Sequence, residues 1–136
     1  MPAFSRILMI AVLVALGGGA AHADGDPDKG AKVFKKCMPC HRVGPGAAAL
    51  VGPPLNGVVG AKAGEVPNYA FSDALKNSGL VFDEATLVKW LRNPRQLVPG
   101  NRMTFAGLTK DSERADVIAY LNSMSEHPAP LPTASK

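Results

Sequence analysis

The amino-acid sequence predicts a small all-α domain with about four short helices joined by irregular loops. Three observations lead to this prediction. Apolar residues recur at helical spacing in several stretches, no stretch alternates like a convincing β-strand, and residues 43–64 are rich in glycine, alanine and proline. A loop of that length is uncommon in a compact domain, and it suits a chain that wraps around a cofactor.

The first 23 residues are predicted to be a cleaved secretory signal peptide. Arg6 supplies a positive start, residues 7–15 are apolar, and Ala21-His22-Ala23 gives a small-x-small cleavage site. The apolar run is too short to cross a bilayer comfortably, so cleavage is favoured over a retained membrane anchor. The mature domain then covers residues 24–127, and a flexible tail rich in proline and alanine covers residues 128–136.

A first helix is expected to begin at Asp26, a good N-cap, with Pro27 at the first helical position. Gly30 lies inside this helix at a cost of about 1 kcal/mol relative to alanine. Either the cost is tolerated, or another helix approaches closely there. The apolar face of the helix comprises Val33, Phe34 and Cys37.

This helix leads into Cys37-Met38-Pro39-Cys40-His41, a Cys-x-x-Cys-His motif that signals covalent attachment of a c-type haem. Residues three apart share a face of a helical turn, so the thiols of Cys37 and Cys40 can each add to one vinyl group of a porphyrin. The imidazole of His41 can then bind the iron as the proximal ligand.

Other uses of the two cysteines fit the sequence less well. A zinc site needs about four ligands, and the chain offers only His22 and His127 besides the motif. A thioredoxin-like dithiol is typical of a βαβ setting, which is absent before the motif, and a disulfide between Cys37 and Cys40 would close almost no loop. The histidine directly after Cys40 therefore favours haem.

Three further helices are expected after the long loop. The first covers residues 72–77 and stops at Ser78-Gly79, and the second begins at the N-cap Asp83 and ends at Asn93-Pro94. Trp90, the single tryptophan, lies beside the apolar stripe of the second helix and is expected to contact the core or the haem. The last helix spans about residues 110–125.

The second axial ligand is expected to be Met103, in a turn-bounded loop at residues 99–107. Met1 and Met9 leave with the signal peptide. Met38 is held on the proximal side by the cysteines, and Met124 lies on the apolar face of the last helix, where methionine usually fills the core. Met103 can present its sulfur without breaking a helix.

Charge gives information about partners. Without the signal peptide the chain has 14 Lys and Arg against 11 Asp and Glu, a net charge of +3 that is too weak and scattered for nucleic-acid binding. Several basic residues nevertheless lie near the motif or the methionine loop. They form either an ordinary solvated surface or a positive rim that steers an acidic partner. These residues are Lys35, Lys36, Arg42, Arg92, Arg95 and Arg102.

Four segments together resemble the class I c-type cytochromes, and most of all the bacterial periplasmic c2 type related to mitochondrial cytochrome c. They are residues 30–41, Gly52-Pro53-Pro54-Leu55-Asn56-Gly57, the loop at residues 99–107 and Ala119-Tyr120-Leu121. The resemblance covers nearly the whole mature chain in the expected order. It implies the small cytochrome c fold around one covalent haem c, bound by Cys37, Cys40, His41 and Met103.

The resemblance also implies supporting roles. The Pro53 carbonyl would accept a hydrogen bond from His41, Gly30 and Phe34 would cross the last helix near Tyr120, and Phe105 would cover the haem edge. Asn101, Tyr69 and Trp90 complete the implied cofactor-binding set. The implied docking rim comprises Lys36, Arg95, Arg102 and Lys110.

The chain departs from the mitochondrial pattern at three positions that usually hold polar partners of a haem propionate. Ala61 stands where arginine is usual, Phe71 where tyrosine is usual, and Phe82 where tryptophan is usual. Tyr69 and Trp90 are the candidate replacements. The reduction potential therefore cannot be transferred from the family.

With both axial positions filled, the iron has no place for a substrate, which predicts an electron carrier and not an enzyme. The resemblance implies a soluble, monomeric periplasmic protein that serves a bc1-type donor and a terminal oxidase, another reductase or a photosynthetic centre, with no stable membrane insertion. Two alternatives remain open from the sequence. They are a five-coordinate haem enzyme or sensor, in which Met103 is detached, and a thiol-disulfide oxidoreductase that uses Cys37 and Cys40.

Overall fold

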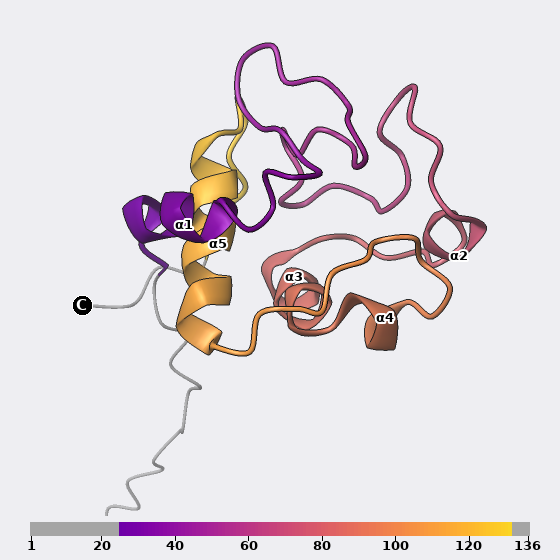
Figure 1. The fold of residues 1–136 in the computed structure, drawn as a ribbon. Coiled ribbons are helices and arrows are strands. Elements are labelled where there is room, and N and C mark those ends of the chain that lie inside the picture. The colour runs from indigo at the N-terminus through magenta and orange to yellow at the C-terminus, as the bar shows by residue number, and fades with distance from the viewer. Residues whose placement is uncertain (1–24, 132–136) are drawn as a thin grey trace, which may run out of the picture.

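The computed structural model describes residues 25–131, which form five helices connected by loops (Figure 1). Within this range there is no strand, and the one β-bridge joins Lys62 to Val81. The predicted all-α class is confirmed. The predicted signal peptide and residues 132–136 lie outside the described range. The helices are α1 (Pro27–Phe34), α2 (Asp73–Lys76), α3 (Glu84–Arg92), α4 (Pro94–Leu97) and α5 (Asp111–Ser123).

The start of α1 is fixed by a cap and by a contact with α5. The Asp26 carboxylate accepts hydrogen bonds from the N–H groups of Asp28 (2.9 Å) and Lys29 (3.2 Å), as an N-cap does. The Asp26 N–H in turn donates to the Asp116 carboxylate of α5 at 2.7 Å. Local capping and a long-range bond therefore set the first helix in its place.

Helices α1 and α5 cross at Gly30 (Figure 1). A Cβ atom on Gly30 would lie 2.7 Å from the Cβ of Tyr120, and it would also collide with the Asp116 carbonyl. Phe34, one turn further along α1, packs its ring against Tyr120 with centroids 5.4 Å apart. The glycine inside the helix is therefore needed for close approach.

The short helix α4 was not predicted from the sequence. Asn93 ends α3 in an extended conformation, and its side-chain oxygen accepts a hydrogen bond from the Gln96 N–H at 3.1 Å. Pro94 then occupies the first helical position, where its missing N–H costs nothing. The residues expected to stop one helix also begin the next.

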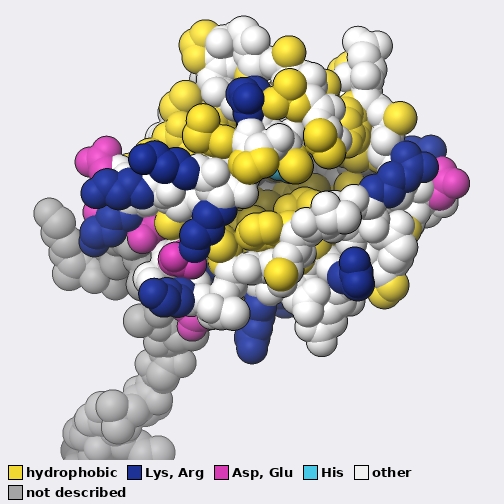
Figure 2. All heavy atoms as spheres, viewed as in Figure 1, with side chains coloured by type: hydrophobic (Ala, Val, Ile, Leu, Met, Phe, Trp, Pro, Cys, Tyr) yellow, Lys and Arg dark blue, Asp and Glu magenta, His cyan; other side chains and the backbone are white. Residues whose placement is uncertain are grey.

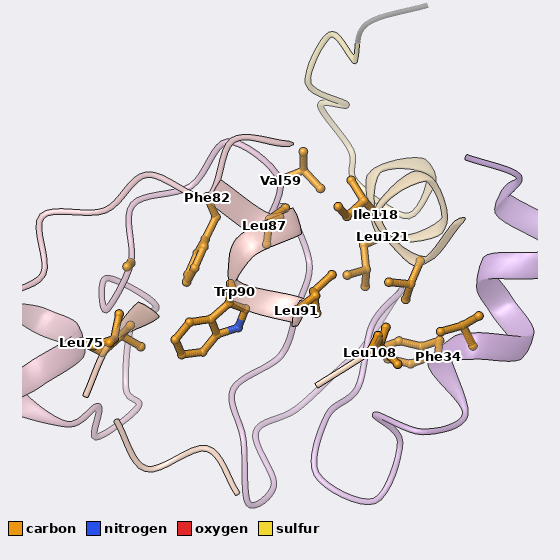
Figure 3. Close-up of a cluster of buried hydrophobic side chains, with 14 residues drawn as sticks. Phe34, Val59, Leu75, Phe82, Leu87, Trp90, Leu91, Leu108, Ile118 and Leu121 are labelled. Carbon is orange, nitrogen blue, oxygen red and sulfur yellow. The ribbon is translucent and has the colours of Figure 1, made fainter. Parts of the chain in front are cut away.

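The hydrophobic core lies between α3, α5 and the end of α1 (Figure 3). Leu87 and Leu91 of α3 face Ile118 and Leu121 of α5, and Ile118 is only 1% exposed. Phe82 and Trp90 extend the cluster away from α5, with ring centroids 5.5 Å apart. The core thus packs the helices together, and it also includes Val59 from the long loop.

The chain beyond α5 turns back onto that helix. Asn122 is buried, its side-chain amide donates to the Ala129 carbonyl at 2.9 Å, and its side-chain oxygen accepts from the Ala129 N–H at 2.9 Å. Leu131 packs partly against the core. Residues 128–131 of the predicted flexible tail are therefore held against α5, and residues 132–136 lie outside the described range.

Across residues 25–131, none of the helices has the length and apolar character that crossing a membrane would require.

Replacing Gly30 by alanine should destabilise the protein by about 2 kcal/mol, because overpacking the α1–α5 crossing outweighs the gain in helix propensity. Guanidinium unfolding measures this change. Lys32→Ala, at an exposed position of the same helix, serves as the control and should change stability by less than about 0.5 kcal/mol. A Gly30→Ala protein as stable as the wild type would contradict the proposed packing role.

Candidate functional site

Helix α1 ends at Phe34, but hydrogen-bonded turns continue through the cysteine motif. The Phe34 carbonyl accepts from the N–H groups of Cys37 (2.7 Å) and Met38 (3.2 Å). The Cys37 carbonyl accepts from Cys40 (3.1 Å) and His41 (2.9 Å). One turn of backbone therefore carries two half-buried, unpaired thiols and an imidazole.

The protonation of Cys37 distinguishes between uses of the motif. Burial raises the pKa of the Cys37 thiol to about 11, although the neighbouring Lys36 ammonium acts in the opposite direction. At neutral pH this thiol is protonated and therefore a poor nucleophile. A dithiol oxidoreductase needs an attacking cysteine with a lowered pKa, so the environment of Cys37 does not suit this residue to that role.

The imidazole of His41 is clamped by the Gly52-Pro53 segment. Its Nδ1 lies 2.8 Å from the Pro53 carbonyl oxygen. Because a carbonyl oxygen only accepts, Nδ1 carries the proton and donates, and the lone pair of Nε2 is left for a metal. The Gly52 N–H donates to the Cys40 carbonyl at 2.8 Å, which brings the Gly52 backbone against the ring.

The loop after the motif is fastened by polar contacts. Asn56 and Gly44 exchange two hydrogen bonds: the Gly44 N–H donates to the amide oxygen at 3.1 Å, and the amide nitrogen donates to the Gly44 carbonyl at 2.8 Å. Further along, the Tyr69 hydroxyl donates to the Val51 carbonyl at 2.6 Å. These contacts give the glycine- and proline-rich loop one defined course without regular structure.

The loop that carries Met103 is fastened by Asn101. The Asn101 amide nitrogen donates to the carbonyls of Pro94 (2.9 Å) and Val98 (2.7 Å), and its oxygen accepts from the Met103 N–H at 2.9 Å. Met103 and Phe105 pack against the core and remain half-buried. Asn101 was predicted as a cofactor-binding residue, and the contacts found here place it as a clamp on the methionine loop.

A hollow opens in the face of the molecule shown in Figure 2. Its walls are mostly hydrophobic, and a histidine side chain is visible at its floor. Apolar side chains that pack on the core but stay half-exposed include Val58, Phe71, Met103 and Phe105. Two thiols, an imidazole with a free Nε2 and a thioether make a donor set suited to a covalent haem, so the residues present fit that group.

The two candidate replacements for the propionate partners lie in different surroundings. Tyr69 donates its hydroxyl proton to Val51, and its ring meets Phe71 edge-on with centroids 4.7 Å apart. Trp90 is 7% exposed and packs against Phe82. The half-buried Ala61 offers no side-chain donor.

The four residues of the predicted docking rim are exposed, but they differ in whether their positive charge is already paired. Lys36 forms an ion pair with Glu113 of α5 at 2.9 Å, and this ammonium holds the pKa of the Glu113 carboxyl below its usual value. The Arg102 guanidinium reaches the Ala70 carbonyl at 3.4 Å. Arg95, on α4, and Lys110, at the start of α5, are exposed. Lys and Arg side chains are visible on several sides of the hollow in Figure 2.

Arg114 is a residue near the methionine loop that no sequence pattern singled out. This residue of α5 is 2% exposed, and its guanidinium donates to the Leu108 carbonyl and to the Asp111 carboxylate. The sequence signal was an Asp and an Arg three residues apart, a pattern that is common on exposed helix faces. Burial of this arginine against the end of the methionine loop depends on tertiary packing.

Replacing Gly52 by alanine should cost about 2 kcal/mol of stability, because the added Cβ would lie 2.7 Å from His41 Nδ1 and displace the ring. Chemical unfolding gives the loss. Gly46→Ala is the matched control: it has open space but a φ of +73°, so it should cost only about 1 kcal/mol of backbone strain. Equal losses at the two positions would mean that the ring is not tightly clamped.

Comparison with known proteins agrees with this geometry. The cytochrome c family model matches residues 27–125. Cytochrome c2 of Rhodomicrobium vannielii is 54% identical over 119 residues, covering 83% of this chain and 95% of the relative, and cytochrome c2 of Rhodoblastus acidophilus is 53% identical over 98 residues, covering 72% and 92%. The solved structure of cytochrome cH from Methylobacterium extorquens is 49% identical, with a TM-score of 0.69, and covers 73% of this chain and 99% of that one.

The match spans the cysteine motif, the loops around the hollow and the methionine loop, and its coverage of each of these relatives exceeds nine tenths. Membership implies a covalently bound haem c and electron transfer without catalysis. This chain therefore belongs to the cytochrome c family and is a mono-haem electron-transfer protein.

Proposed function

We propose that this protein is a soluble periplasmic electron carrier whose haem iron is bound by His41 and Met103. The observation that carries the proposal is the hydrogen bond from His41 Nδ1 to the Pro53 carbonyl, which leaves Nε2 free for iron, together with a methionine loop held in place by Asn101. When bound, haem c takes up and releases one electron at its iron.

The protein side chains have separate tasks in this proposal. Cys37 and Cys40 would hold the haem through thioether bonds, and His41 and Met103 would bind its iron. Phe105 adds apolar cover on the methionine side. With His41 and Met103 both bound to it, the iron would offer no site for a substrate, and the haem would supply electron exchange alone. A five-coordinate enzyme or sensor would need Met103 to be detached, which the Asn101 clamp opposes.

The proposed partners are membrane redox complexes with acidic docking faces. Arg95, Arg102 and Lys110 offer exposed positive charge, while Lys36 shares its charge with Glu113. Encounters between small charged redox proteins are brief and weaken as salt screens the charges. The proposed electron donor is a bc1-type complex. The proposed electron acceptor is a terminal oxidase, another reductase or a photosynthetic centre.

The periplasmic location rests on the sequence of the first 23 residues, with its positive start, apolar run and Ala21-His22-Ala23 cleavage site. Cleavage after Ala23 leaves a mature carrier that begins at Asp24. A monomer is proposed for this mature form.

Optical spectra of the purified mature protein test the axial ligands. The oxidised wild type should show the weak near-infrared band from sulfur to iron, and Met103→Ala should lose it and lower the reduction potential, because a thioether ligand favours reduced iron. Met124→Leu is the control, since this methionine lies next to the end of α5, and it should keep the band. A wild type without the band would argue against Met103 as a ligand.

Counting thiols tests the cysteines. The denatured mature protein should contain no free thiol, because Cys37 and Cys40 would both be in thioether bonds. A thiol-specific reagent measures the thiols, and intact mass should report one haem together with the loss of residues 1–23. Two reactive thiols and a colourless protein from cells able to mature c-type cytochromes would support the thiol oxidoreductase instead.

A further inference from the structure

The methionine loop has no regular structure between residues 101 and 110, so its shape depends on how its two ends are fastened. The first end is held by Asn101, as described above. The second end, at Gly107-Leu108, lies where α3 and α5 approach each other. The second fastening has no counterpart in the sequence motifs.

Leu108 is fixed from three directions. Its side chain is 2% exposed in the core, its N–H donates to the Leu91 carbonyl of α3 at 2.7 Å, and its carbonyl accepts from the Arg114 guanidinium of α5. Next to it, a Cβ on Gly107 would lie 2.7 Å from the carbonyl carbon of Arg92. The loop end is therefore pressed against α3 and tied to α5.

The Arg114 side chain is a buried cation with few hydrogen-bond partners. It is 3% exposed, whereas the carboxylate side chain of its partner Asp111 is 93% exposed. A guanidinium stays charged at every accessible pH, and a buried charge is costly unless it is hydrogen-bonded. One guanidinium nitrogen, Nε, has no partner among the described residues. The bonds to Leu108 and Asp111 are thus the polar contacts that keep this charge in place.

We propose that Arg114 is a positioning residue for Met103: by tying Leu108 to α5 it keeps the methionine loop in the conformation that presents the sulfur. Four residues separate Met103 from Leu108, so release of this end would let the sulfur move away. The inference rests on the proposed role of Met103 as the distal ligand.

Competition by an external ligand measures how often the Met103 sulfur is detached from the iron. Imidazole can bind the oxidised iron only while Met103 is detached, so its apparent affinity follows the population of the detached state. In the holoprotein, Arg114→Met should raise the imidazole affinity about tenfold, because a charged hydrogen bond that holds the loop is lost. Arg114→Lys keeps one donor and should give an intermediate value.

A matched variant separates positioning from general destabilisation. Val117→Ala removes core volume from α5 at a residue that is 0% exposed, and it should lower the unfolding free energy by about 2 kcal/mol while leaving the hydrogen bonds of Arg114 to Leu108 and Asp111 in place. Its imidazole affinity should stay within about twofold of the wild type, because the loop fastening is unchanged. The Leu108 amide should also exchange hydrogen faster in Arg114→Met than in Val117→Ala.

A milder variant carries the test if Arg114→Met does not fold. Asp111→Asn leaves the guanidinium bonded to Leu108 but weakens its other contact, and it should raise the imidazole affinity about twofold. Unchanged affinity in both Arg114→Lys and Asp111→Asn, or an equal rise in Val117→Ala, would overturn the positioning role. A wild type without the sulfur-to-iron band would overturn the proposed ligand and this inference together, whereas a normal band with unchanged affinities would overturn the inference alone.

Discussion

The hydrogen bond from His41 to the Pro53 carbonyl is the contact on which the rest of the site depends. It fixes the ring orientation and assigns the proton to Nδ1, so that Nε2 is available to a metal. The cysteine motif alone would leave the imidazole free to rotate. The bond requires the chain to return to His41 twelve residues later, and Gly52 makes the close approach possible.

Both sides of the hollow are built from loops, and hydrogen bonds hold the loops in place on each side. On the histidine side, Asn56 pairs with Gly44 through two hydrogen bonds. On the methionine side, Asn101 clamps the entry of the loop and Leu108 its exit. Side-chain amides thus replace regular secondary structure near the cofactor. A site held in this way changes little when an electron arrives, which suits electron transfer.

Features that depend only on residues close together in the sequence could be predicted from it. The caps at Asp26 and Asp83 are local, and both helices begin where the sequence indicates. The short helix expected at residues 72–77 covers Asp73–Lys76 and has Ser72 as its N-cap. Helix α4 was missed because Pro94 was interpreted only as a stop, although proline is also favoured at the first helical position. Arg114 was missed because its burial depends on Leu108 from outside its own helix. The ion pair of Lys36 with Glu113 could not be predicted either, because the two residues are 77 positions apart in sequence.

The proposed electron carrier requires His41 and Met103 to bind the iron in both oxidation states. X-ray absorption at the iron edge of the purified holoprotein, oxidised and then reduced, reports the ligands in each state. We expect six-coordinate iron with five nitrogen ligands and one sulfur ligand in each state, with little change in the bond lengths between the states. Five-coordinate iron in either state, or a sixth ligand other than sulfur, would contradict it.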